Sequence, residues 1–159
     1  MLSYKNRRPR MKLWMSLYAM VWIVFIDFML AMTPGASIVL LYLHIALGLV
    51  IIGLASYNFN GVRMTAVPGR VKRIAKTTLN LSIVSGVLGF LLYFGTGKAL
   101  PILFGVTLGG LILFLHVMIG FAIITQAAAV AIAYDMWEDK EFVKETAPGE
   151  VPEMPAPGQ

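Results

Sequence analysis

The two histidines of this chain, His44 and His116, are the residues whose chemistry most needs an explanation. They are the only histidines in 159 residues, and both lie inside long apolar runs. The runs read LHIALG and LHVMIG, so a glycine, Gly48 or Gly120, follows each histidine four residues later. Neutral imidazole is a common metal ligand and proton carrier. Two imidazoles in matching apolar surroundings indicate one shared site.

The matched sequences around the histidines, offset by 72 positions, predict an internal repeat of helical hairpins. Ser37 and Gly109 stand seven residues before the two histidines. On a helix, positions −7 and +4 share a face with the residue between them. Each of the two helices is therefore expected to present a stripe of small residues with one imidazole projecting from it. Ser37, Gly48, Gly109 and Gly120 are candidate cofactor-binding residues.

The composition indicates that lipid surrounds most of the chain. Hydrophobic residues make up 58% and charged residues 13%, and the mean hydropathy is +0.79. These values are typical of an integral membrane protein. The chain has no cysteine, which excludes disulfides, covalent c-type haem attachment, thiolate metal sites and a cysteine nucleophile.

Apolar segments predict an all-α protein with a single transmembrane domain over residues 1–134. A helix needs about 20 residues to cross the hydrocarbon core, and backbone groups in lipid must satisfy one another, which favours helices. The expected architecture is an up-down bundle of four helices. The predicted helices cover about 13–31, 36–56, 77–94 and 102–134. Residues 135–159 are expected to form an acidic, proline-rich cytoplasmic tail with a short helical extension to about residue 144.

Lysines and arginines predict the orientation of the bundle. Twelve of the thirteen precede the first segment, lie between the second and third, or follow the fourth; Lys98 is the exception. The positive-inside rule places both termini in the cytoplasm of a multi-pass protein of the cell's inner membrane. The positive charge is explained by topology and by contact with the lipid bilayer, so no nucleic-acid partner is expected.

Bundle geometry connects the two histidines. In an up-down bundle the second and fourth helices run in the same direction and lie diagonally across the core. His44 and His116 would then lie at similar depth, roughly 12 Å from the outer ends of their helices. Two imidazoles on facing helices can bind the iron of one flat macrocycle, and Gly48 and Gly120 leave room for its edge. The pattern predicts one haem b per chain with both histidines as axial ligands.

Other interpretations of these residues remain open. A lone membrane histidine is often hydrogen-bonded within the bundle, and stripes of small residues commonly serve helix packing alone. A zinc or copper site is less favoured, because two ligands leave the coordination sphere open.

At these residues the chain resembles bis-histidine membrane cytochromes b and one half of haem A synthase. The resemblance covers roughly residues 41–134: the His-x-x-x-Gly-Leu-Val run at His44, the RIAKTTLNLSIVSGVLG segment, and the Leu-His at His116. It implies a haem held between helices of a four-helix bundle. Where the synthase pattern has a glutamate and an arginine around the first histidine, this chain has Leu41 and Ile45, and the outer-loop cysteines of the synthase are absent. Many cytochromes of the first family hold two haems per bundle; this chain has ligands for one.

A single haem near the outer face cannot by itself carry an electron across about 30 Å of hydrocarbon. It could pass electrons between a quinone in the bilayer and an acceptor on the outer side, so the predicted function is electron transfer. The expected partners are a quinone in the bilayer and a redox protein outside. The chain is expected to act as a separate protein, as a homo-oligomer or as a subunit of a respiratory complex. Two alternatives remain: a haem-dependent enzyme of haem A synthase type, and an accessory membrane subunit without cofactor.

Asp27 is the only acid within an expected apolar helix, and it lies near the predicted haem depth. A carboxylate inside a membrane is costly and is a functional candidate. We expect it to accept a proton during quinol oxidation; the alternative is that it caps a neighbouring helix or faces the interface. Tyr42, Asn80 and Gln126 are further candidates for a quinone pocket, although packing hydrogen bonds explain them equally well.

The predicted orientation can be tested by labelling, because the chain has no native cysteine. An impermeant maleimide should label the single-cysteine variant Thr33→Cys on intact cells, and should label Arg70→Cys only after permeabilisation. Labelling of Arg70→Cys on intact cells would contradict the orientation.

Overall fold

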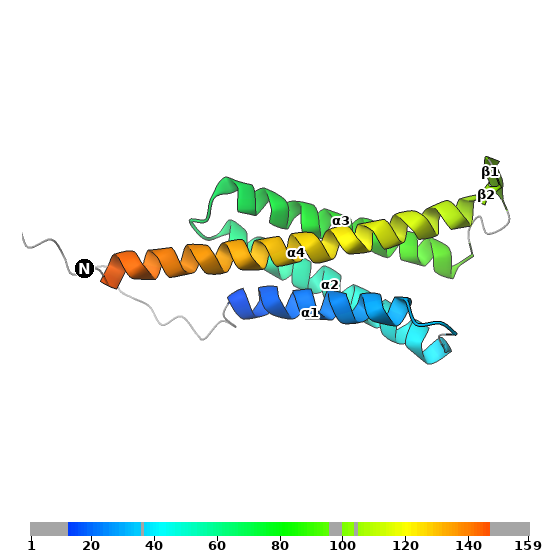
Figure 1. Cartoon of the computed structure of the whole chain (residues 1–159), viewed down its shortest axis with the longest axis horizontal. Helices are drawn as coiled ribbons and strands as arrows, with labels where there is room; N and C mark the ends of the chain where they lie inside the picture. The colour runs from blue at the N-terminus through cyan, green and yellow to red at the C-terminus, as the bar shows by residue number, and fades with distance from the viewer. Residues whose placement is uncertain (1–12, 36, 96–99, 104, 147–159) are drawn as a thin grey trace, which may run out of the picture.

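A computed structural model describes residues 13–35, 37–95, 100–103 and 105–146. It contains four helices that are long and apolar enough to cross a membrane, as expected (Figure 1). The helices are α1 (Leu13–Ala31), α2 (Ile38–Arg63), α3 (Gly69–Tyr93) and α4 (Leu108–Thr146). Two short antiparallel strands, β1 (Pro101–Leu103) and β2 (Val106–Thr107), precede α4.

The helices α2 and α3 are longer than their apolar segments. The second helix continues seven residues past the expected end at residue 56, and α3 begins eight residues before residue 77. The basic residues of α3 are polar and so fall between the two predicted apolar segments, but in the structure they belong to the helix. Arg70, Arg73 and Lys76 are exposed on an amphipathic turn whose other face buries Val71 and Ala75. Pro68, the N-cap of α3, marks the start of the helix. The loop is therefore only residues 64–68.

The start of α4 also differs from the expected boundary at residue 102. The strands β1 and β2 precede the helix, and Gly105, just before β2, has a φ of 78°, a conformation that side chains disfavour. The hydroxyl of Thr107 then accepts a hydrogen bond from the backbone N–H of Gly110 at 3.0 Å, which caps the first turn of α4. At its other end α4 continues to Thr146 and projects beyond the other helices (Figure 1). Residues 147–159, the rest of the expected tail, lie outside the described residues.

The four helices pack in a ring. Each contacts its neighbours in the chain, and α1 contacts α4 to close the bundle. Helices α2 and α4 therefore lie diagonally across the core, as the bundle geometry predicted.

Packing within the bundle is uneven along its axis. One cluster of buried residues lies at the end where α1 begins and includes Leu17, Val62 and Tyr134. A second cluster follows further along and includes Met20 and Ile123. Beyond the second cluster, toward the ends where α2 and α4 begin, side chains no longer fill the centre and a cavity takes their place.

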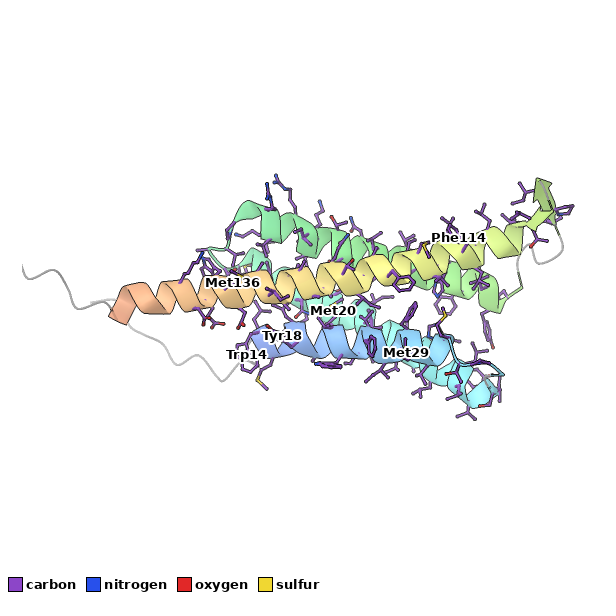
Figure 2. All side chains as sticks on the ribbon, in the orientation of Figure 1. Trp14, Tyr18, Met20, Met29, Phe114 and Met136 are labelled. Carbon is purple, nitrogen blue, oxygen red and sulfur yellow. The ribbon has the colours of Figure 1, made fainter. Side chains whose placement is uncertain are left out.

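The outer surface of the bundle is apolar. Large hydrophobic side chains such as Trp22, Val39 and Phe114 are more than half exposed. Figure 2 shows Phe114 pointing away from the bundle. A soluble bundle would place charged residues on this surface. The exterior suits lipid, and the chain is a multi-pass membrane protein.

Candidate functional site

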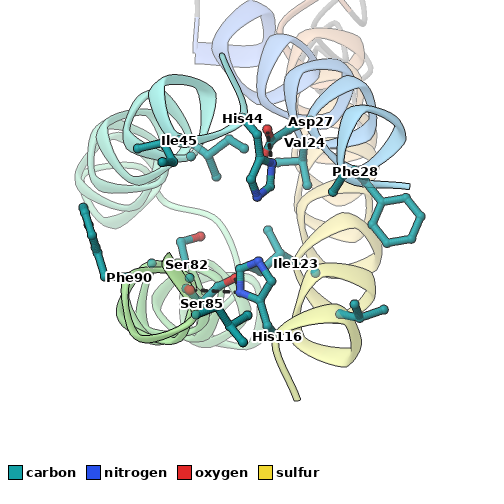
Figure 3. A pocket seen from close by; sticks show the side chains of 18 of the residues that line it. Val24, Asp27, Phe28, His44, Ile45, Ser82, Ser85, Phe90, His116 and Ile123 are labelled. Atoms are coloured by element: carbon teal, nitrogen blue, oxygen red, sulfur yellow. Dashed lines mark hydrogen bonds and ion pairs between the residues drawn. The ribbon is translucent and has the colours of Figure 1, made fainter. Parts of the chain in front are cut away.

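The cavity between the four helices has a volume of about 470 Å³. That size is within the range of about 300–1,000 Å³ typical of cofactor and ligand sites. Both histidines line it, together with Asp27, Gly48 and Gly120 (Figure 3). Five of the seven residues singled out in the sequence are thus brought together, from α1, α2 and α4.

The two imidazole rings face each other across the cavity. Their centres are 6.1 Å apart and their planes are at 89°. In Figure 3 the ring of His44 points down from α2 and that of His116 points up from α4, each with a nitrogen toward the space between them. With metal–nitrogen bonds of about 2 Å and a ring half-width of about 1 Å on each side, two axial imidazoles on one ion have centres roughly 6 Å apart. The observed separation matches that value.

The orientation of His44 is set by Asp27. The Nδ1 of His44 lies 2.8 Å from Oδ1 of Asp27, whose residue is only 8% exposed. A carboxylate accepts a hydrogen bond from Nδ1–H, which leaves Nε2 directed away from Asp27 and into the cavity. Carboxylate–histidine pairs of this kind fix the tautomer and raise the basicity of metal-binding histidines.

The orientation of His116 is set by Ser85 on α3. The Nδ1 of His116 lies 3.0 Å from the backbone oxygen of Ser85 and 3.2 Å from its hydroxyl oxygen. A carbonyl oxygen only accepts, so Nδ1 of His116 carries the proton and donates it. The Nε2 of this histidine is therefore also a free acceptor facing the cavity. Both rings are held at Nδ1 and both present Nε2.

Close packing of α3 against the site depends on two glycines. A Cβ on Gly89 would lie 3.3 Å from Cε1 of His116, and a Cβ on Gly86 would lie 3.0 Å from Cδ1 of Ile52. A side chain at either position would require His116 or Ile52 to shift. The sequence reasoning missed Ser85, Gly86 and Gly89 as site residues. The spacing Ser85-x-x-x-Gly89 of small residues is the signal that could have identified this face of α3.

Gly48 and Gly120 leave free space within the cavity. A Cβ on Gly48 would have no heavy atom within 4 Å, and one on Gly120 would make an ordinary contact of 3.7 Å with Phe28. Because both glycines line the cavity, a side chain at either position would occupy volume that is open in this structure.

Ser37 and Gly109 lie outside the cavity lining. Ser37 is the N-cap of α2, and its hydroxyl accepts a hydrogen bond from the backbone N–H of Leu40 at 3.4 Å. Gly109 is buried in the first turn of α4. Both residues occupy helix starts, so the small-residue stripe of each helix faces the cavity only from the histidine onward.

The residues considered for a quinone pocket are scattered. Gln126 belongs to α4, and its Oε1 accepts a hydrogen bond from the hydroxyl of Thr78 on α3 at 3.2 Å. Asn80 and Tyr42 are exposed on the outer faces of α3 and α2. None of the three lines the cavity that holds the histidines.

The donor set of the site fits haem better than a bare metal ion. Within the described ranges, no three His, Cys, Asp or Glu side chains gather as metal ligands. Zinc sites usually need three or four protein ligands, whereas a porphyrin brings four nitrogens of its own and asks the protein only for axial ligands. Two opposed imidazoles in an apolar cavity meet that requirement.

Comparison of the chain with protein-family models, with curated proteins and with solved structures finds no match. The assignment of this site therefore rests on its own geometry.

Replacing Asp27 tests the hydrogen bond that orients His44. Asp27→Ala should weaken haem binding by about 10–100-fold, the usual cost of losing a partner of a metal-binding histidine. Asp27→Asn should retain most of the affinity, because its amide oxygen can still accept the Nδ1–H bond. The measurement is a haem titration followed by absorbance, and equal affinities for all three proteins would contradict the role of Asp27.

Proposed function

We propose that the chain is a membrane haem b protein that transfers electrons, with His44 and His116 as the axial ligands of one haem per chain. One observation carries the proposal: two imidazoles, each held at Nδ1, present their Nε2 atoms to each other with ring centres 6.1 Å apart.

Haem held by two histidines supplies reversible one-electron transfer at iron. The side chains of this protein hold and orient it. Asp27 and Ser85 fix the two imidazoles, and Val24, Ile51 and Ile123 close the inner end of the cavity with apolar surface that excludes water. Since both axial positions would be taken by protein nitrogens, no position stays open for oxygen. This favours electron transfer over a haem-dependent reaction of haem A synthase type.

The orientation predicted by the positive-inside rule puts this site in the outer half of the inner membrane, with both termini cytoplasmic. A quinone in the bilayer would then be one redox partner, and a protein on the outer side or within a respiratory complex the other. The cavity supports a membrane-soluble partner, because Leu49 of α2 and Phe90 of α3 both line it and are exposed on the bundle surface. Asp27 is retained as a candidate proton acceptor beside the haem.

Removing either axial ligand tests the proposal directly. His44→Ala and His116→Ala should each abolish the low-spin absorbance spectrum and lower haem affinity by more than about 100-fold. This loss is larger than the one expected for removing a hydrogen-bond partner such as Asp27. Ser37→Ala is the matched control on α2, because Ser37 caps the helix outside the cavity. Haem content and the reduced-minus-oxidised spectrum of the purified proteins give the readout. A normal spectrum in either histidine variant would contradict bis-histidine ligation.

Filling the cavity tests the position of the cofactor while both ligands remain. Gly48→Leu should lower haem affinity about tenfold or more, since an overpacked site typically costs about 1–3 kcal/mol. Gly120→Leu should act in the same direction. Gly53→Leu is the control: Gly53 lies on the exposed face of α2, outside the cavity, and a Cβ there meets nothing within 4 Å.

Haem titrations of the three glycine variants would separate a steric effect in the cavity from a general effect of leucine in α2. Equal haem affinity of Gly48→Leu and Gly53→Leu would place the haem elsewhere.

A further inference from the structure

A second, smaller hollow lies between α3 and α4, toward the end of the bundle that carries most of the positive charge. Its volume is about 310 Å³. We call it the basic groove, and it is lined by Arg70, Arg73, Ile74, Thr77, Thr125, Gln126 and Ala129. It is separate from the histidine cavity, with which it shares no lining residue.

The two arginines of the groove have no acidic partner among the described residues, where the ion pair of His44 with Asp27 is the one observed. The nearest acid along α4, Asp135, instead accepts a hydrogen bond from the Tyr18 hydroxyl of α1 at 3.3 Å. Positive charges at the edge of a membrane span are costly unless they are paired or reach the interface. Within the part of the chain that the structure describes, the groove therefore presents two guanidinium groups without an acidic partner.

The polar groups around the arginines leave a donor available. The hydroxyls of Thr77 and Thr125 donate to backbone oxygens of their own helices. Gln126 uses Oε1 to accept from Thr78, and its amide Nε2 makes no hydrogen bond within the described part of the chain. Two guanidinium groups and an amide N–H are the donors that a phosphate diester accepts.

The surface next to the groove is apolar on both helices. Val84 lies seven residues after Thr77 and Met118 seven residues before Thr125, so each shares a helix face with a groove residue. Both are exposed, at 45% and 42%. After Lys76, α3 has no charged residue up to its end at Tyr93. A ligand in this groove would have its anionic group beside the arginines and its apolar part along α3 and α4.

We propose that the basic groove binds the phosphate group of an anionic phospholipid, with Arg70, Arg73 and the Gln126 amide as donors and the acyl chains on the exposed faces of α3 and α4. Basic pockets between transmembrane helices on the cytoplasmic side are suited to such headgroups. The proposal does not depend on haem binding, and failure of either leaves the other standing.

Native mass spectrometry of the full chain in mild detergent tests the groove, with dioleoyl phosphatidylglycerol and dioleoyl phosphatidylcholine as the added lipids. The wild-type protein should bind one phosphatidylglycerol per chain in preference to phosphatidylcholine. Arg70→Gln/Arg73→Gln should bind phosphatidylglycerol at least about 30-fold more weakly, because two charge-assisted hydrogen bonds to the phosphate are lost. Arg63→Gln/Lys76→Gln removes the same charge outside the groove and should change binding less than about threefold, because that loss of charge acts only through the general field.

Three further measurements separate the possible causes of such a loss. Gln126→Ala should also weaken phosphatidylglycerol binding without altering the charge, and circular dichroism should show unchanged helix content in all variants. Inorganic phosphate added as a competitor should not displace the lipid, because it lacks acyl chains. Displacement by phosphate, equal losses in the two double variants, or no phosphatidylglycerol on the wild-type protein would each overturn the proposal.

Discussion

The hydrogen bond between Asp27 and His44 is the interaction on which the rest of the candidate site depends. It joins α1 to α2 at 2.8 Å in a region where the surrounding side chains are apolar. In such surroundings neither group can be left without a partner at low cost. The hydrogen bond satisfies the buried carboxylate and directs the free nitrogen of His44 at His116. The Ser85 carbonyl does the same for His116 from α3, so every helix of the ring contributes to the alignment of the two imidazoles.

The uneven packing of the bundle follows from this arrangement. The two hydrophobic clusters hold the helices together around Leu17, Val62 and Met20, and side chains fill the centre of that half. In the other half the polar pairs and the small residues of α2, α3 and α4 keep the centre open. The cavity in that half has a volume of about 470 Å³ and mostly apolar walls. A haem in that space would contact those walls and bind both free nitrogens, which is why we propose a cofactor rather than a purely structural pair.

Much of the fold could be predicted from the sequence, because the lipid phase leaves few alternatives to apolar helices. The first helix was predicted with its observed ends, and the diagonal placement of α2 and α4 followed from their order. The helix ends outside the apolar segments could not be predicted in the same way. Hydropathy locates the membrane-spanning segment but not the full length of the helix. The turns of α3 that carry Arg70 and Arg73 are polar and therefore fall outside the predicted segment at 77–94.

Part of the candidate site could also be predicted from the sequence. His44, His116 and the glycines after them could be found because the two sequences LHIALG and LHVMIG are so alike. The partner of His44 was noticed as a buried acid, but the rotation of α1 that brings Asp27 to it is a property of tertiary packing. Ser85 contacts His116 through its backbone oxygen as well as its hydroxyl. The spacing of small residues could indicate this face of α3, but the residue type gives no signal for a backbone contact.

The most direct test of the central claim is a haem titration of the purified wild-type chain, followed by its reduced-minus-oxidised absorbance spectrum. We predict saturation at one haem b per chain, with the bands of a low-spin haem bound by two histidines. A wild-type protein that stays colourless with excess haem would contradict the claim and would indicate an accessory membrane subunit with structural histidines.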